Sequence, residues 1–255
     1  AREGRKAGTS LRSPLVRSTR GNFASDDAAR LSFRAIEVVD SLALATRLGT
    51  AMASSTTGDL LLFVHGYNTS FVGAAERAAR LAVELQYPGG VVLYTWPSDG
   101  LLASYRGDQA EARASGKVLA AFLRELQQAA PSRRLSVVAH SMGSEVFAAA
   151  MRHLDSLRSP LRLGHVVLVS PDLEAEEFLV RLLPSLRARA VDVTVYAASA
   201  DFALWSSWGS NGARRLGLGG RLATIARGVE TIEVPYDATD ALGHNPFLTE
   251  PFRND

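Results

Sequence analysis

Residues 135–143 read Leu-Ser-Val-Val-Ala-His-Ser-Met-Gly, an apolar run that leads into a turn around Ser141. Small residues, Ala139 and Gly143, stand two positions to either side of the serine. A small–x–Ser–x–Gly turn after a strand is typical of a nucleophile elbow, a sharp strand-to-helix turn that holds a serine hydroxyl clear of the sheet. Larger flanking side chains would collide across such a turn. The segment therefore predicts a strand, a tight turn and a helix, and the alternative is an ordinary glycine-containing turn of an α/β protein.

Short apolar runs alternate with longer amphipathic ones along the rest of the chain. The expected strands are Ser32–Val39, Leu60–Val64, Val91–Thr95, Leu135–Ala139, His165–Ser170, Val191–Ala197 and Thr231–Val234. The expected helices are Ala74–Gln86, Ser104–Ala129, Gly143–Leu157 and Leu173–Arg187. This alternation predicts right-handed crossovers and an α/β fold with a mostly parallel, doubly wound sheet flanked by helices.

The domain organisation follows from composition. Residues 1–30 carry seven arginines or lysines against three acidic residues, are rich in Gly, Ser and Thr, and lack clear periodicity. We expect a flexible basic arm there, solvated rather than bound, with association with an anionic surface as the alternative. No repeat or low-complexity linker divides residues 31–255, which we expect to form a single catalytic domain.

Several classes of function are disfavoured. A net charge of +2 gives no general attraction to nucleic acid, and the absence of cysteine excludes disulfides, thiolate catalysis and zinc–thiolate sites. No apolar run, Leu60–Val64 included, is long enough to span a bilayer, so integral membrane association is not expected. No paired metal-ligand motif appears, and Gly217–Gly220 lacks the Lys-Ser/Thr of a phosphate loop, so we expect no metal and no cofactor. The first residue is not Met and no signal peptide is recognisable, which leaves both a cytoplasmic and an exported location open.

In open α/β sheets, ligands bind beyond the carboxyl ends of the strands. Polar and aromatic residues follow nearly every expected strand: His65-Gly66-Tyr67-Asn68, Trp96-Pro97-Ser98-Asp99, His140-Ser141-Met142, Pro171-Asp172 and Ser199-Ala200-Asp201. This clustering predicts an active site at that edge of the sheet.

A catalytic serine needs a base and an acid that orients the base. His244 is the favoured base because it lies in a Gly- and Pro-flanked loop after the last strand, whereas the other four histidines fit structural positions. We expect His65 and His140 to shape the oxyanion turn and the elbow. His153 falls within a helix and His165 opens a strand.

Two aspartates compete for the role of the acid. Asp201 follows the strand before the last and is favoured, whereas Asp172 is better explained as the N-cap of the next helix. The resulting order, Ser141, Asp201, His244, is the order expected of α/β-hydrolases.

The expected oxyanion hole consists of the backbone N–H groups of Met142 and Tyr67, with Asn68 as the alternative to Tyr67. Trp96, Asn68 and Phe71 are candidate substrate-binding residues, although packing explains Trp96 equally well. Asp108 and Tyr105 are expected to brace the Trp-Pro-Ser loop by hydrogen bonding. The glycine-rich segment 205–221 suggests a mobile flap, and no insertion is long enough for a large lid.

Three segments resemble a known family: Phe63-Val-His-Gly-Tyr-Asn68, Tyr94-Thr-Trp-Pro-Ser-Asp-Gly100 with Ser104-Tyr105-Arg-Gly-Asp108, and Ala139-His-Ser-Met-Gly143. They are similar to the bacterial α/β-hydrolases catalogued as DUF900, whose members are esterase-like. The resemblance extends roughly from Phe33 to His244 and includes Val195-Tyr-Ala-Ala-Ser-Ala-Asp-Phe-Ala-Leu204, whose aspartate matches the family's acid. It implies an α/β-hydrolase fold with a minimal cap and a Ser141–Asp201–His244 triad.

These observations favour a serine carboxylesterase that hydrolyses short-chain or small soluble esters through an acyl-enzyme. One alternative is a lipase or acyltransferase that acts on a lipid or polymer ester, with the basic arm as its docking element. Another is a non-catalytic binding module on a hydrolase fold. The sequence carries no indication of the oligomeric state.

Overall fold

The computed structural model describes residues 36–54, 59–99, 104–129 and 134–235 together with His244. The chain divides into two units, residues 1–40 and 41–255. In the first unit the described residues, 36–40, form neither helix nor strand, so the described part of the expected strand Ser32–Val39 is not a strand. The expected basic arm, residues 1–30, lies outside the described residues.

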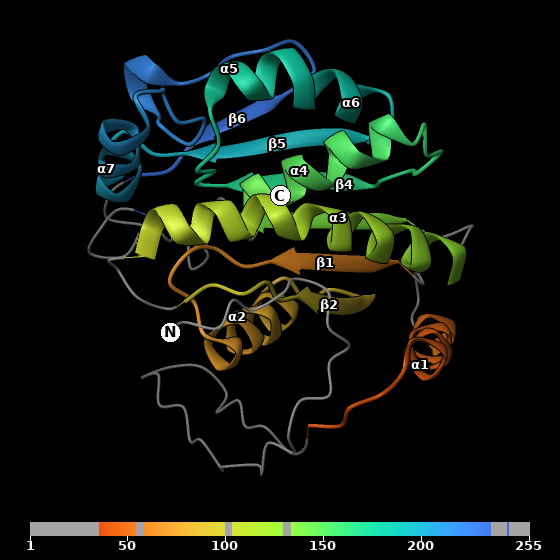
Figure 1. The fold of residues 1–255 in the computed structure, drawn as a ribbon. Coiled ribbons are helices and arrows are strands. Elements are labelled where there is room, and N and C mark those ends of the chain that lie inside the picture. Colours follow the sequence, from red (N-terminus) through yellow and green to blue (C-terminus); the bar gives the residue numbers. More distant parts are fainter. Residues whose placement is uncertain (1–35, 55–58, 100–103, 130–133, 236–243, 245–255) are drawn as a thin grey trace. The chain divides into compact units, whose positions relative to one another are not determined.

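A six-stranded sheet with every neighbouring pair parallel forms the centre of the second unit, with strand order β2-β1-β3-β4-β5-β6 (Figure 1). The strands are β1 Leu60–Val64, β2 Gly90–Tyr94, β3 Leu135–His140, β4 His165–Val169, β5 Asp192–Ala197 and β6 Glu230–Glu233. All six lie within one residue of their expected positions at either end. Near-continuous Val and Leu runs form them because the central strands are covered on both faces.

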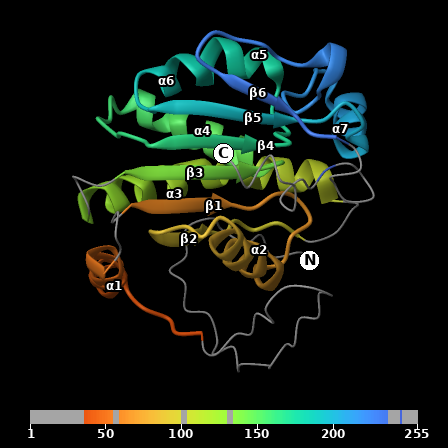
Figure 2. The ribbon, with the colours of Figure 1, turned by 180° about the vertical axis from the view of Figure 1, so that it is seen from behind.

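The helices are α1 Ser41–Ser54, α2 Phe71–Glu84, α3 Tyr105–Ala129, α4 Gly143–Ser156, α5 Ala175–Glu177, α6 Leu183–Arg187 and α7 Phe202–Asn211, with a π-helical turn η2 Phe178–Leu182 and a 3₁₀ turn η3 Gly220–Leu222. Helices α3, α4, α5 and α6 cover the face of the sheet that is toward the viewer in Figure 1. Helix α2 lies on the opposite face, which Figure 2 brings to the front. The doubly wound α/β architecture expected from the sequence is therefore confirmed.

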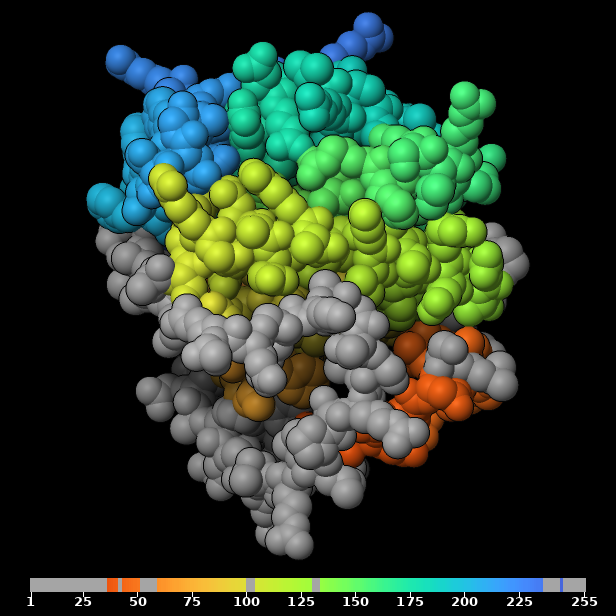
Figure 3. Space-filling view, viewed as in Figure 1, coloured from red at the N-terminus to blue at the C-terminus, as the bar shows by residue number. Residues whose placement is uncertain are grey.

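Each face of the sheet has its own apolar core, and β1 contributes to both. Leu60, Leu62 and Val64 point into the larger core, which α3 and α4 close. The intervening Leu61 and Phe63 point into the smaller core beneath α2. On the face that carries the larger core, α3 forms a continuous ridge beside α4 (Figure 3). Because successive residues of a strand point to opposite faces, a continuous apolar run supplies both cores.

Two parts of the structure differ from expectation. Helix α1 was not expected. The segment 205–221 is not a loose flap, because its first part belongs to α7 and Leu218 bridges to Ala198 at the end of β5. A Cβ on Gly217 would lie 2.7 Å from the backbone nitrogen of Pro171, so this glycine allows two backbone segments to approach closely. None of the helices in the described part of the chain is long and apolar enough to cross a membrane.

Candidate active site

The turn between β3 and α4 holds Ser141 in a left-handed backbone conformation, with φ of 52°. Such a φ is uncommon for a residue with a side chain and requires support from its surroundings. That support comes from β4 and the residues after it: the Ser141 N–H donates to the Val169 carbonyl at 2.9 Å, and the Ser141 carbonyl accepts from the Asp172 N–H at 3.1 Å. The strained serine is thus held by its own backbone hydrogen bonds.

Glycines let this turn pack against the end of β1. A Cβ on Gly143 would lie 2.6 Å from the carbonyl oxygens of both Val64 and His65. A Cβ on Gly66 would lie 2.9 Å from the Ser141 Cβ and from the His140 ring. The contacts at Gly143 are with backbone atoms, which a side chain at this position could not displace, and this explains the Gly of the sequence motif in this fold.

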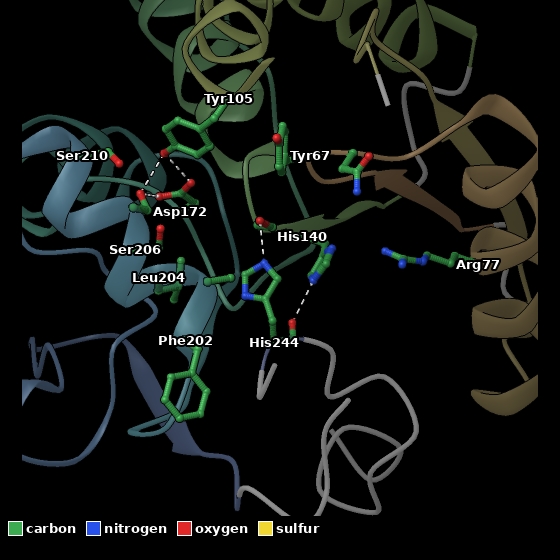
Figure 4. A pocket seen from close by; sticks show the side chains of 14 residues that line it. Tyr67, Arg77, Tyr105, His140, Asp172, Phe202, Leu204, Ser206, Ser210 and His244 are labelled. Carbon is green, nitrogen blue, oxygen red and sulfur yellow. Dashed lines mark hydrogen bonds between the residues drawn. The ribbon is translucent and has the colours of Figure 1, made fainter. Parts of the chain in front are cut away.

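Three side chains, those of Ser141, His244 and Asp201, form a continuous hydrogen-bonded chain at the carboxyl edge of the sheet. Figure 4 shows His244 among the residues that line the neighbouring cavity. The Ser141 Oγ lies 2.7 Å from the Nε2 of His244, and the Nδ1 of His244 lies 2.7 Å from the Asp201 Oδ2. Asp201 is fully buried, and its other oxygen accepts the Leu204 N–H at 3.0 Å, so it also caps α7. The structure therefore brings together the serine, acid and base expected from the sequence.

Asp172, the alternative acid, has a different set of partners. Its Oδ2 accepts from the Tyr105 hydroxyl at 2.7 Å and its Oδ1 from the Ser207 hydroxyl at 2.5 Å, while the Nε of Arg215 lies 3.6 Å away. The expected N-cap role is wrong, because Glu174 precedes α5 and caps it without a side-chain hydrogen bond. Burial and the neighbouring Asp172 raise the pKa of Tyr105. Asp172 thus joins α7 to the start of α3 through buried polar contacts.

Two buried histidines, His65 and His140, hold neighbouring parts of the site in place by hydrogen bonds. The Nε2 of His65 accepts the Trp96 N–H at 3.2 Å, and the Trp96 indole donates to the His65 carbonyl at 2.8 Å while the two rings stack. The Nε2 of His140 lies 3.1 Å from the carbonyl oxygen of His244. Burial lowers the pKa of His65, and burial followed by the neighbouring His244 and Arg77 places the pKa of His140 well below its usual range.

A cavity of about 430 Å³ opens above Ser141. Its lining includes Tyr67 and Asn68 from the loop after β1 and residues of α2 and α7. Neither Trp96, 3% exposed, nor Phe71, 48% exposed, belongs to this lining. Of the three expected substrate-binding residues, the structure thus places only Asn68 at the cavity. The Met142 side chain is buried in the core, which leaves its backbone as the part available to a substrate.

The Trp-Pro-Ser loop is braced by one of the two residues expected there. Asp108 accepts the Ser98 hydroxyl at 2.5 Å and the Asp99 N–H at 3.0 Å. Tyr105 instead points to Asp172 and donates to it. Trp96 therefore belongs to the supporting structure of the site, consistent with the packing interpretation.

Sequence reasoning missed the cavity residues supplied by helices. They are Arg77 of α2, Tyr105 of α3, and Phe202, Ala203, Leu204, Ser206, Ser207 and Ser210 of α7. The sequence does not identify them as cavity residues, because the packing of each helix on the sheet decides which of its side chains face a cavity. Among the residues that the structure describes, no group of three histidines or carboxylates could hold a metal ion.

Comparison with known proteins identifies a family to which this chain is similar. A family model described as "Alpha/beta hydrolase of unknown function (DUF900)" matches residues 40–252. Among solved structures, the mature form of a lipase from Bacillus licheniformis matches with a TM-score of 0.38 and 16% sequence identity, covering 68% of this chain and 82% of the lipase. No curated protein sequence matches the chain.

Proposed function

Because the chain belongs to the DUF900 family of α/β hydrolases, we propose that it is a serine carboxylesterase with Ser141, Asp201 and His244 as its catalytic triad. The observation that carries the proposal is the chain of two 2.7 Å hydrogen bonds through His244. A serine hydroxyl is a weak nucleophile, and an oriented imidazole within hydrogen-bond distance is what activates it.

The geometry supports an acyl-enzyme mechanism. The Ser141 Oγ attacks the ester carbonyl carbon while the Nε2 of His244 accepts the hydroxyl proton. The bond to the alcohol oxygen then breaks, and the same proton passes to the departing alcohol. Water, deprotonated by His244, attacks the acyl carbon and releases the acid and Ser141. The buried carboxylate of Asp201 holds the imidazole in the required tautomer and stabilises its charged form.

We assign the oxyanion hole to the backbone N–H groups of Met142 and Tyr67. Met142 begins the turn into α4, where the helix dipole favours negative charge, and Tyr67 belongs to the loop that packs against the elbow through Gly66. Each such donor contributes about 3 kcal/mol to transition-state stabilisation in comparable enzymes. We further propose that the substrates are short-chain or small esters, for which a cavity of about 430 Å³ has room.

The test is a panel of p-nitrophenyl esters of increasing acyl length. We expect activity toward the short members, and Ser141→Ala is expected to remove it together with labelling by a fluorophosphonate. A folded Ser141→Ala variant that retained full activity would refute the proposal. Absence of both activity and labelling in the wild-type protein would instead favour a non-catalytic binding module.

A lipase is the second candidate, and exposed aromatic residues on α7 favour it. Phe202 is 58% exposed, Trp205 is 43% exposed, and Trp205 stacks on Trp208, on the same helix that lines the cavity. Aromatic side chains of this kind partition into lipid interfaces. A lipase would show a sharp rise in activity when its substrate aggregates, and Trp205→Ser would weaken that rise.

A further inference from the structure

Apart from histidines, the described residues that line the active-site cavity include two charged side chains, and both have partners within the protein. Asp172 accepts hydrogen bonds from Tyr105 and Ser207, and the Nε of Arg215 lies 3.6 Å from its carboxylate. Arg77 has a partner as well. Both charges are therefore already engaged, so the charged residues of the lining do not mark the cavity as a site for an ionic ligand.

Three neutral side chains of the lining remain available to a ligand. Asn68, in the loop after β1, and Ser206 and Ser210 of α7 are exposed, and their side chains have no hydrogen-bond partner among the described residues. Figure 4 shows Ser206 and Ser210 on the same side of His244 as Leu204. Carboxamide and hydroxyl groups both donate and accept hydrogen bonds. The free polar groups of the cavity thus suit a neutral ligand that carries hydroxyl groups.

The backbone that carries Asn68 is held in place. Its φ of 52° lies in the left-handed region, which asparagine adopts more often than most residues. The next two residues are fixed by their own contacts: the Thr69 hydroxyl donates to the Tyr67 carbonyl at 3.1 Å, and the Ser70 hydroxyl accepts the Gly73 N–H at 3.1 Å. Asparagine in a turn commonly bonds to its own backbone, whereas this carboxamide makes no such bond within the described residues. The backbone of Asn68 therefore has little freedom left to lose when a ligand binds.

The position of Asn68 places its side chain near a bound ester. Asn68 follows Tyr67, whose backbone N–H we assign to the oxyanion hole, and both residues line the cavity together with Ser141. An ester held at Ser141 extends its acyl and alcohol parts along the walls of the same cavity. Apolar side chains such as Leu204 and Phe202 accept the hydrocarbon of that ester. The carboxamide is then the group next to the oxyanion hole that can recognise a hydroxyl group.

We propose that the cavity selects neutral esters that carry hydroxyl groups, and that Asn68 is the residue that determines this specificity. The proposal rests on the proposed esterase function. The carboxamide of Asn68 binds one substrate hydroxyl, and a hydrogen bond between neutral groups changes binding by about fivefold. The preferred substrates are then short esters of polyols, or esters of short hydroxylated acids, and the experiment distinguishes these two placements of the hydroxyl groups.

Two matched pairs of esters test this assignment. The first compares 1-acetylglycerol with propyl acetate, which places the hydroxyl groups on the alcohol. The second compares methyl 3,4-dihydroxybutyrate with methyl butyrate, which places them on the acyl part. We expect kcat/KM for the hydroxylated member to exceed that of the other member by at least about fivefold in one pair. Equal kcat/KM within both pairs, or a preference for the member without hydroxyl groups in both, would overturn the proposal.

Two glycine substitutions identify the responsible side chain. Asn68→Gly removes the carboxamide and keeps the left-handed backbone, which glycine adopts without strain, so we expect the ratio of the two kcat/KM values to fall by about fivefold. Gln86→Gly is the matched control, because Gln86 is exposed, has a φ of 46° and lies outside the cavity lining. It should keep the wild-type ratio, and thermal unfolding checks that both variants are folded. A ratio that Asn68→Gly leaves unchanged would overturn the proposal, even where both rates fall together.

A binding measurement separates this proposal from the esterase assignment. Saturation-transfer NMR on Ser141→Ala is expected to detect 1-acetylglycerol or methyl 3,4-dihydroxybutyrate, and the added Asn68→Gly change should weaken that binding by about fivefold. If the wild-type protein hydrolyses no ester while this Asn68-dependent binding remains, the esterase function fails and the recognition of hydroxyl groups stands. Binding that is equal with and without the carboxamide, or no binding of either ester, rejects the specificity alone.

Discussion

At the scale of single residues, Asp201 combines two roles that are usually separate. One carboxylate oxygen accepts from the backbone N–H of Leu204 and caps α7, and the other accepts from the Nδ1 of His244. The helix cap therefore fixes the position of the group that orients the imidazole. The described hydrogen bonds of the alternative acid, Asp172, go to Tyr105 and Ser207, so Asp201 is the aspartate that contacts His244.

These two roles can be separated by substitution. Asp201→Asn keeps a good N-cap but offers His244 an amide, so we expect kcat to fall by about 10⁴-fold with little change in stability. Asp201→Ala should lower kcat similarly and in addition cost about 1 kcal/mol of unfolding free energy through the lost cap. Ester kinetics and urea unfolding of both variants measure the two effects, and equal stability of the two variants would argue against the capping role.

Gly143, two residues after Ser141, is required by packing. In Gly143→Ala the new methyl group would meet two carbonyl oxygens of the β1 end at 2.6 Å, so we expect loss of activity and a destabilisation of about 3 kcal/mol or more. Gly107→Ala is the matched control, because nothing lies within 4 Å of its Cβ on α3. It should be neutral or stabilise the protein by about 0.5–1 kcal/mol, since alanine favours a helix. Thermal unfolding of the pair checks both expectations.

At the scale of elements, α7 is the helix on which the site depends most. It begins at the capping carboxylate of Asp201, lines the cavity, and is tied to the start of α3 through Ser207, Asp172 and Tyr105. The segment was expected to be a flap because of its glycines, but a buried carboxylate and two hydroxyls hold it in place. The inner face of α7 thus combines one buried apolar residue, Leu204, with the hydrogen bonds of Ser207.

Two serines on α7 allow this anchoring to be measured. Ser207→Ala removes a 2.5 Å hydrogen bond from the buried Asp172, so we expect a loss of about 1–3 kcal/mol in unfolding free energy and a rise in KM. Ser210→Ala, at an exposed position on the same helix, should change stability by less than about 0.5 kcal/mol. Chemical denaturation compares them, and equal losses in the two variants would contradict a structural role for the Asp172 contacts.

At the scale of the whole molecule, the parallel sheet gathers the site. Ser141 follows β3, Asp201 follows β5 and His244 comes after β6, and these strands run in the same direction within one sheet. Ser141 and His244, 103 positions apart in sequence, thereby meet at one edge. The apolar cores on the two faces of the sheet hold the strands in register. The relative positions of Ser141, Asp201 and His244 therefore depend on the packing of the whole sheet.

The free energy of unfolding depends on pH in the alkaline range because burial shifts the pKa of three tyrosines. Burial raises the pKa of Tyr87 and of Tyr94 to about 12, and it raises that of Tyr105 as well. Above pH 10, the ordinary value, the unfolded chain loses these phenol protons while the folded protein keeps them. The folded state then binds more protons than the unfolded state, so the free energy of unfolding must fall as pH rises from 10 toward 12.

Urea unfolding across that pH range measures the loss, with tyrosinate absorbance as the second readout. Tyr94→Phe should show a shallower fall than the wild-type protein, since one of the raised groups is gone. A wild-type protein whose stability is constant over this range, or whose tyrosines all ionise near pH 10 while folded, would contradict the prediction.

The sequence by itself determined the six strands of the sheet, the elbow and the candidate serine, acid and histidine, although it also predicted a strand at Ser32–Val39 whose described part is not one. These follow from local chemistry: apolar runs buried on both faces, small residues where a turn packs on a neighbouring strand, and polar residues directly after strands. Only the tertiary structure decided that Asp172 anchors α7, that Trp96 stacks on His65 outside the cavity, and that Arg77 lines the cavity. The physical reason is that the surroundings of Asp172, Trp96 and Arg77 depend on how the helices pack on the sheet. That packing is determined by contacts between residues far apart in the chain.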